Sequence, residues 1–386
     1  MATGRNDESL EESTIVMKNW ILLNPGPVNV SEKVRQALLT PDICHREEEF
    51  SLLLQQVRSK ILQVLNLNSG YSATILTGSG TAALEAGILA ACSASAPSAK
   101  PRPSGKLLVL SNGIYADRIV DIARRHRIPT KVLRFPYDRR IALDSLNRAL
   151  RKDRGIQTVA MTHHETSTGM LNPLGEIGGL AKQHGKIFAI DAISSLGADP
   201  IDMEKENIDF CVGTAGKCFH AFPGLSFVVA KRALLKNLTK KKVSSLYFDL
   251  GNSWVLQEKG DTPFTPAVQL FSAFNAALDE FLTETLSGRI DSYSRRANLL
   301  RDGFESLGLK YLLPRHFYSN TLTSLVLPRG FSYEKIHDPL KKERFIIYAG
   351  QNQFKRTMFR IAHMGGIPDS ELARLLETLA KVLRSR

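Results

Sequence analysis

Short apolar segments alternate with amphipathic ones over most of this chain, and this alternation is its most restrictive feature. Seven segments rich in β-branched and other apolar residues stand at positions 72–78, 106–112, 130–135, 158–164, 186–192, 209–215 and 225–231. Between them, segments such as 115–126 and 143–152 have the apolar spacing of helices. Strands that are apolar along their whole length are typical of a parallel sheet with helices on both faces. The sequence therefore predicts an α/β fold with a mostly parallel seven-stranded sheet over residues 22–266.

The pattern changes after that region. A long helical segment at 267–282 is followed by shorter apolar segments at 324–328, 345–350 and 358–364. We therefore expect a smaller C-terminal α/β domain over residues 267–386. At the other end, residues 1–21 are predicted to form a polar arm. Residues 93–106, rich in Ser, Ala and Pro, are predicted to form an inserted surface loop.

The charge of the chain is basic, with 51 Lys and Arg against 38 Asp and Glu residues and a net charge of +13. A basic protein can bind nucleic acid, a membrane surface or small anions through its positive charge. No nucleic-acid motif occurs, and no apolar run reaches the roughly 18 residues of a membrane span. The N-terminus lacks a signal-peptide layout, and the four cysteines lack metal-site spacing. We expect a reduced cytoplasmic protein with no metal, nucleic-acid partner or membrane partner.

Lys217 follows the strand predicted at 209–215 and stands among small and apolar residues. A buried ammonium group costs considerable free energy unless it is paired or neutralised. One interpretation is that the side chain extends to the surface along its aliphatic stem. The other is that burial lowers the pKa of the amine and so makes it a nucleophile.

Other polar residues stand where strands end, and in a parallel sheet these ends meet at one edge. Ser79, Gly80 and Thr81 open a predicted helix, where backbone N–H groups bind anions or a hydroxyl simply caps the helix. Tyr115 stands at a strand-to-helix turn and Asp191 at a strand end, although a packed tyrosine and a capping aspartate are the ordinary alternatives. A phosphate site, an aromatic ring, a carboxylate and a desolvated amine together are what pyridoxal 5′-phosphate requires.

Several motifs resemble, in the same order, those of the class V (fold type I) pyridoxal-phosphate-dependent aminotransferases. The motifs are NPGPV, HRE, TGSGTAALEA, SNGIYADR, HETSTGMLNP, IDAISSLGA, GKCFHAFPG, IIYAGQ and FRIAHMGG. The resemblance extends over nearly the whole chain, from residue 22 to residue 366. It implies the large pyridoxal-phosphate-binding domain and smaller C-terminal domain of that fold. Within the class, HETSTGMLNP and IIYAG are most similar to enzymes that act on a phosphonate amine, and alanine–glyoxylate enzymes are close relatives.

The resemblance implies roles for individual residues. Lys217 would form the Schiff base with the cofactor and move the proton during catalysis. Asp191 would pair with the pyridine nitrogen. The other residues implied to bind the cofactor are Ser79, Gly80, Thr81, Tyr115, Thr166, Ile193 and Thr265.

The resemblance also implies a contact between subunits and residues that bind the substrate. Thr265 is similar to a threonine that contacts the phosphate in the neighbouring subunit, which implies a homodimer with shared active sites. Arg360 is similar to the arginine that binds the acidic group of the substrate. His45 and Arg46 are implied to lie near the substrate entrance.

The reaction implied is transamination of 2-aminoethylphosphonate with pyruvate, giving phosphonoacetaldehyde and alanine. An alternative is an alanine–glyoxylate or serine–pyruvate type aminotransferase, with carboxylate substrates alone. A class V lyase would need a catalytic cysteine in the C-terminal half, and none follows Cys218. A non-enzymatic basic binding protein on the same fold is a further alternative, against which Lys217 and Asp191 argue.

Overall fold

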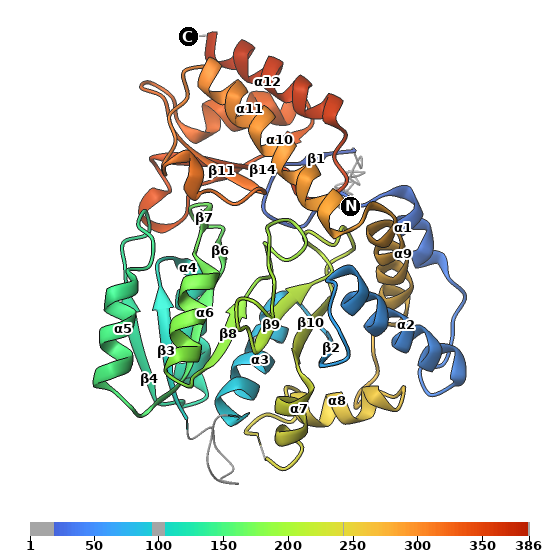
Figure 1. Cartoon of the computed structure of the whole chain (residues 1–386). Helices are drawn as coiled ribbons and strands as arrows, with labels where there is room; N and C mark the ends of the chain where they lie inside the picture. Colours follow the sequence, from blue (N-terminus) through green and yellow to red (C-terminus); the bar gives the residue numbers. More distant parts are fainter. Residues whose placement is uncertain (1–18, 95–104, 242, 385–386) are drawn as a thin grey trace, which may run out of the picture.

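A seven-stranded sheet forms the centre of the chain in a computed structural model that describes residues 19–94, 105–241 and 243–384. Its strand order is β2-β10-β9-β8-β5-β3-β4, with β10 antiparallel to its neighbours and the other pairs parallel. The predicted fold class, a mostly parallel sheet with helices, is confirmed (Figure 1). The strands are β2 (Tyr71–Thr77), β3 (Lys106–Ser111), β4 (Thr130–Arg134), β5 (Ile156–Thr162), β8 (Ile187–Asp191), β9 (Phe210–Thr214) and β10 (Leu225–Lys231).

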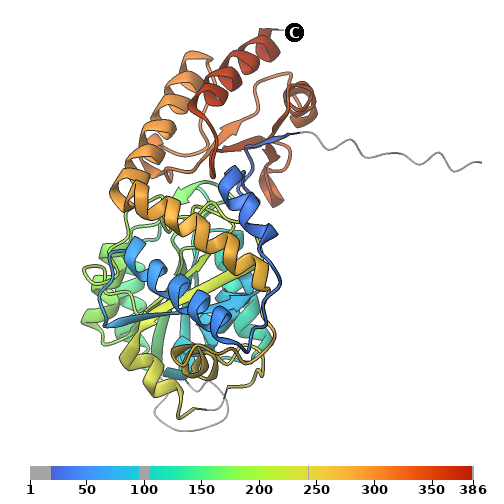
Figure 2. The ribbon, with the colours of Figure 1, turned by 90° about the vertical axis from the view of Figure 1, so that its right-hand side faces the viewer.

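Helices cover both faces of this sheet, which explains why its strands are apolar throughout. Val159 and Met161 of β5 join the core on one face, whereas Ala160 between them joins the core on the other, as the pleat requires. The first face is covered by α2 (Glu48–Val64), α5 (Leu143–Lys152), α6 (Leu174–Gln183) and α9 (Val268–Glu284), and Figure 2 shows α2 and α9 crossing it. The second is covered by α3 (Gly80–Ala94), α4 (Ile114–Arg125), α7 (Arg232–Leu238) and α8 (Leu250–Glu258).

A second, smaller sheet combines β11 (Leu322–Val326), β14 (Met358–Ala362) and β13 (Tyr348–Ala349). Helices α10 (Leu286–Ser306), α11 (Tyr333–Lys342) and α12 (Asp369–Arg384) pack on it around a separate core. The short strand β1 (Ile21–Leu22) pairs with β12 (Phe345–Ile346), so the start of the described chain lies against this part. Figure 1 shows the small sheet next to the hairpin of β6 (His164–Glu165) and β7 (Met170–Leu171).

The domain boundaries expected from the sequence stay a prediction. Helix α9, which follows the expected boundary at 266/267, packs Phe271, Phe274 and Phe281 into the core of the large sheet. The α10 helix then carries the chain into the smaller part. Residues 1–18 of the predicted arm and residues 95–104 of the predicted loop lie outside the described residues.

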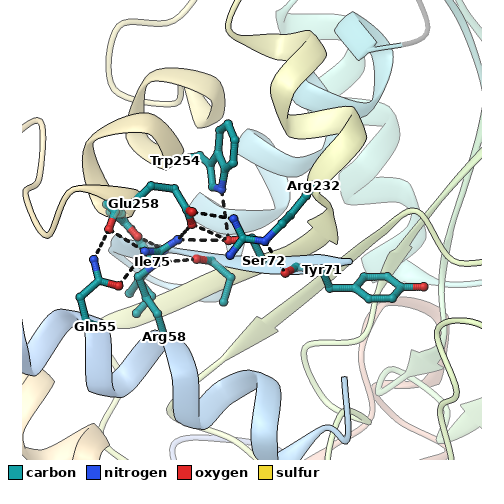
Figure 3. A network of polar contacts seen from close by, with 10 residues as sticks. Gln55, Arg58, Tyr71, Ser72, Ile75, Arg232, Trp254 and Glu258 are labelled. Carbon is teal, nitrogen blue, oxygen red and sulfur yellow. Dashed lines mark hydrogen bonds and ion pairs between the residues drawn. The ribbon is translucent and has the colours of Figure 1, made fainter. Parts of the chain in front are cut away.

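A network of ionic and polar contacts joins helices α2, α7 and α8 to strand β2 (Figure 3). The buried Arg58 forms an ion pair with Glu258, and its Nε donates to the carbonyl of Ala73 at 2.9 Å. Glu258 also accepts from Arg232 at 2.5 Å and from the Ser72 hydroxyl at 3.0 Å. The guanidinium groups of this scaffold thus have a carboxylate partner within the chain.

The described helices include none with the length and apolar character needed to cross a bilayer. Cys44 is exposed, whereas Cys92, Cys211 and Cys218 are buried, and no disulfide joins any of these four described cysteines. The cytoplasmic location expected from the sequence stays a prediction.

Candidate active site

A cavity of about 280 Å³ lies where strands of the large sheet end and helices α3 and α4 begin. Carboxyl ends of parallel strands meet at one edge of a sheet, so residues far apart in sequence converge there. The structure brings together eight residues that the sequence singled out. The cavity is lined, among others, by Ser79, Gly80, Thr81, Tyr115, Thr166, Asp191, Ile193 and Lys217.

Lys217 lies in the turn that follows β9, and its side chain is half-buried. The side chain lies against Gly26 of the NPGPV motif, where a Cβ atom would come 2.5 Å from Nζ. Burial lowers the pKa of the Lys217 amine to about 8, and the Arg118 and Arg360 cations act in the same direction. The Asp191 carboxylate partly opposes this effect. A fraction of the Lys217 side chain is therefore a neutral, nucleophilic amine near neutral pH.

Asp191 ends strand β8 and is 4% exposed. Its Oδ1 accepts a hydrogen bond from the backbone N–H of Ile193 at 3.0 Å. Burial raises the pKa of Asp191 to about 6, although this N–H and the cations Arg118 and Lys217 favour the charged form. The result is a desolvated carboxylate at the cavity wall, able to hold a proton on a basic ligand atom.

The first turn of α3 forms one end of the cavity. Ser79, Gly80 and Thr81 are there, at the N-terminus of a 15-residue helix whose first N–H groups attract anions. At Gly80, a Cβ atom would lie 2.9 Å from Cδ1 of Ile193, so the glycine permits the close approach of these two walls. A helix start of this kind is suited to binding an anion.

Glu165 is a site-associated residue that the sequence interpretation did not select. It is fully buried, and its Oε2 accepts from the backbone N–H groups of Tyr115 at 3.0 Å and Ala116 at 3.2 Å. The Ser167 hydroxyl donates to Oε1 at 2.7 Å. Burial raises the pKa of Glu165 to about 7, and these hydrogen bonds oppose the shift. Glu165 thereby fixes the start of α4, and with it the Tyr115 ring.

Arg118 is the second residue that the interpretation missed. It belongs to α4, lines the cavity, and donates from Nη1 to Oγ1 of Thr81 at 3.0 Å. Its presence in the SNGIYADR motif, one helical turn after Tyr115, was the available signal.

Arg360 lies in the middle of β14 and is 2% exposed. Its Nε donates to the carbonyl of Ala349 at 3.0 Å, and its Nη1 donates to the carbonyl of Thr166 at 2.9 Å. A third bond joins Nη1 to the side-chain oxygen of Gln351 at 3.2 Å. These acceptors are all neutral, and Arg360 forms no ion pair with any described residue. Since Thr166 lines the cavity, a guanidinium without an ion pair lies directly behind the cavity wall.

Three predicted site residues are not brought to this cavity within one chain. Arg46 forms an ion pair with Asp261, and its Nη1 donates to the carbonyl of Thr262 at 2.9 Å. Thr265 lines a separate small pocket next to β2, and neither it nor His45 borders the Lys217 cavity. The contact of Arg46 with residues 261–262 places the segment of His45 and Arg46 next to the segment that contains Thr265, away from the Lys217 cavity.

A family model supports the resemblance seen in the motifs. The family described as "Aminotransferase class-V" matches residues 33–366 of this chain. The match covers the whole large sheet, the cavity residues from Ser79 to Lys217, and the β14 strand that carries Arg360.

Individual relatives extend over nearly the whole chain. The 2-aminoethylphosphonate–pyruvate transaminase of Phocaeicola vulgatus is 33% identical, covering 95% of this chain and 100% of its own. The enzyme of the same name from Vibrio cholerae is 35% identical, covering 94% and 98%. Among solved structures, an alanine–glyoxylate aminotransferase from Nostoc sp. has a TM-score of 0.88 at 24% identity, covering 99% of this chain and 100% of its own. That structural likeness bears on the fold.

Proposed function

Since the chain belongs to the class V aminotransferases, we propose that it uses pyridoxal 5′-phosphate to transfer the amino group of 2-aminoethylphosphonate to pyruvate. The observation that carries this proposal is the half-buried Lys217 amine, which shares one cavity with the buried Asp191 carboxylate and an anion-binding helix start. The substrates rest on the names of relatives that match this chain over nearly its whole length.

The residues of the cavity fit this cofactor. The first turn of α3 suits its phosphate, Asp191 suits its pyridine nitrogen, and Tyr115 and Ile193 offer surfaces for the two faces of its ring. When bound, pyridoxal phosphate supplies an electron sink for the negative charge that develops where the donor carbon loses a proton.

The chain's own residues would then carry out binding and proton transfer. The Lys217 amine, with its pKa lowered to about 8, holds the cofactor covalently and acts as general base and acid at the donor carbon. The Asp191 carboxylate keeps a proton on the ring nitrogen. Glu165 orients Tyr115 by accepting from the first N–H groups of α4.

Arg360 is proposed to bind the acidic group of each substrate in turn. A planar guanidinium matches a carboxylate in a bidentate manner and also binds a phosphonate. Only neutral groups accept hydrogen bonds from Arg360 in the described chain, so its charge stays available for an anion.

A homodimer would complete the site. Thr265, His45 and Arg46 lie outside the cavity of their own chain, and we propose that they reach the cavity of a second subunit. The family resemblance and this separation from Lys217 support the arrangement.

A donor screen tests the proposal. The purified protein with pyridoxal phosphate is given 2-aminoethylphosphonate, alanine or serine as donor, and pyruvate or glyoxylate as acceptor. We expect alanine to form from pyruvate fastest with 2-aminoethylphosphonate. Activity confined to carboxylate donors would show an alanine–glyoxylate or serine–pyruvate type enzyme instead. Borohydride reduction followed by peptide mapping should locate the cofactor on Lys217, and attachment to another lysine would contradict the site.

A further inference from the structure

Arg118 places a guanidinium group beside the phosphate-binding turn. It lies on α4, one turn after Tyr115, and its side chain lines the cavity. Its Nη1 donates to Oγ1 of Thr81 at 3.0 Å, across 37 residues of sequence. The centre of the guanidinium also lies 4.7 Å from the centre of the Tyr115 ring, within the range of a cation–π contact. One cation therefore contacts two residues that were predicted to hold different parts of the cofactor.

Arg118 forms no ion pair with a carboxylate of the described residues, although its charge acts on the Asp191 carboxylate, which lines the same cavity. Its neighbour Asp117 forms an ion pair with Arg134 on the outer side of α4. The side chain of Arg118 is instead only partly exposed and faces the cavity. An arginine stays protonated at all physiological pH values, and partial desolvation of its charge costs free energy unless an anion is near. The guanidinium faces the cavity next to the first turn of α3, where it would contact an anionic group bound there.

The bond to Thr81 also determines what the threonine can offer. A hydroxyl has one proton to donate and two lone pairs that accept. Because Arg118 donates to one of these lone pairs, the hydroxyl proton of Thr81 remains available to donate to a ligand oxygen. Thr81 lies in the first turn of α3, a position where backbone N–H groups lack intrahelical partners. A guanidinium, a hydroxyl and the helix start thus lie together at one end of the cavity.

We propose that Arg118 completes the cofactor phosphate site, by adding a positive charge there and by holding Thr81 as a hydrogen-bond donor. This inference rests on the proposed function, because it takes pyridoxal phosphate as the ligand. The cation of the phosphate site would then come from the same subunit as Lys217.

The test compares pyridoxal phosphate with pyridoxal, which has the same ring and aldehyde without the phosphate. Equilibrium binding of both to the cofactor-free protein is measured by absorbance for the wild type and Arg118→Gln. A hydrogen bond to a charged group supports an expected loss of about 10- to 150-fold in affinity for pyridoxal phosphate. The affinity for pyridoxal should stay nearly unchanged. Arg118→Lys should retain part of the phosphate preference, because the charge remains.

A matched control is Arg125→Gln, which removes the same charge from an exposed position of the same helix. It should change neither affinity. An equal loss for both ligands in Arg118→Gln would overturn the inference, because it would show that Arg118 only supports the Tyr115 ring or the fold. Unchanged binding of pyridoxal phosphate in Arg118→Gln and Arg118→Lys would overturn it as well. If the wild type binds neither ligand, the proposed function itself fails, and the inference fails with it.

A double variant tests the part played by Thr81. If Arg118 acts partly through this hydroxyl, the free energies of pyridoxal phosphate binding lost in Arg118→Gln and in Thr81→Val should sum to more than the free energy lost in the double variant. Fully additive losses would overturn the orienting role and leave the charge as the whole effect.

Discussion

The cations of this chain occupy two contrasting environments. In the network of α2, α7 and α8, Arg58 and Arg232 share the carboxylate of Glu258 (Figure 3). Around the cavity, Arg360 donates only to neutral oxygens, and Arg118 and Lys217 form no ion pair with a described residue.

Ion pairing distinguishes the cations that support the fold from the cations at the candidate site. A desolvated cation needs an anion nearby, because burial without one costs several kcal/mol or more. In the network that anion is part of the chain, so the contact stabilises the fold. At the cavity three cations face a single lining carboxylate, that of Asp191, and no ion pair joins them to it, so the phosphate and the acidic substrates of the proposed reaction would supply further negative charge. Lys217, Arg118 and Arg360, which form no ion pair within the described chain, all lie at the cavity or directly behind its wall.

For the cavity, the variant with the largest expected effect is Lys217→Ala. We expect turnover to be lost, since removal of general acid/base catalysis alone usually costs about 10²- to 10⁴-fold and the covalent attachment disappears with it. The fold should persist, because the amine forms no ion pair within the described chain. Steady-state kinetics and borohydride mapping measure the two losses. Activity near that of the wild type would remove Lys217 from the mechanism.

The scaffold side is tested by Glu258→Gln. This change leaves the buried Arg58 guanidinium without a counter-charge, and breaking a buried pair usually costs about 3–5 kcal/mol. We expect about 3 kcal/mol here, because the Glu258 side chain is 30% exposed. Thermal unfolding should show a clearly lower Tm, while the affinity for pyridoxal phosphate stays the same. Glu377→Gln, at an exposed position of α12, is the control and should leave the Tm unchanged.

The opposite outcome would be equally informative. An unchanged Tm in Glu258→Gln, combined with weaker cofactor binding, would mean that the network serves the site rather than the scaffold. The contrast between the two regions would then be wrong.

Sequence reasoning identified the strand ends well, for a physical reason. Each buried strand is a short apolar segment, and the polar residue that ends it is visible in the sequence. The segment 209–215 became β9 (Phe210–Thr214), with Lys217 just beyond it, and Asp191 was found at the end of β8. Convergence at one sheet edge then follows from the topology.

What the sequence could not provide was packing between distant elements. Glu165 reaches the start of α4 from 50 residues away, and Arg118 reaches Thr81 from 37 residues away. Both contacts depend on how α4 lies against β6 and α3. Likewise, the apolar face of α9 is evident in the sequence, but its packing with α2 against the large sheet is not.

Arg360→Lys tests whether an unpaired guanidinium recognises the substrates. Lysine keeps the charge and loses the planar fork, so kcat/KM should fall about 10- to 150-fold with both 2-aminoethylphosphonate and pyruvate. The affinity for pyridoxal phosphate should not change. A loss with pyruvate alone would mean that the phosphonate is bound elsewhere, with His45 and Arg46 as the next candidates. No loss with either substrate would make Arg360 a structural residue.

The smallest expected effect is the pH dependence of the rate at which the cofactor attaches to Lys217. Only the neutral form of the Lys217 amine can attach the cofactor, and its pKa is lowered to about 8. The neutral fraction is then about one-tenth at pH 7 and about nine-tenths at pH 9, so the rate of covalent attachment should rise roughly tenfold and then level off. Stopped-flow absorbance with the cofactor-free protein measures this rate. The carboxyl groups of Asp191 and Glu165 change charge at lower pH, near 6 and 7.

The sign of a second shift shows whether unpaired cations keep this amine neutral. The Arg118 charge lowers the pKa of Lys217, so Arg118→Gln should raise that pKa and move the midpoint of the rate profile to higher pH. Arg125→Gln, with its charge on the outer surface of the same helix, should leave the midpoint in place. If the wild-type rate still rises tenfold per pH unit above pH 9, the Lys217 amine behaves like a solvated lysine, and neither burial nor the cations around the cavity lower its pKa.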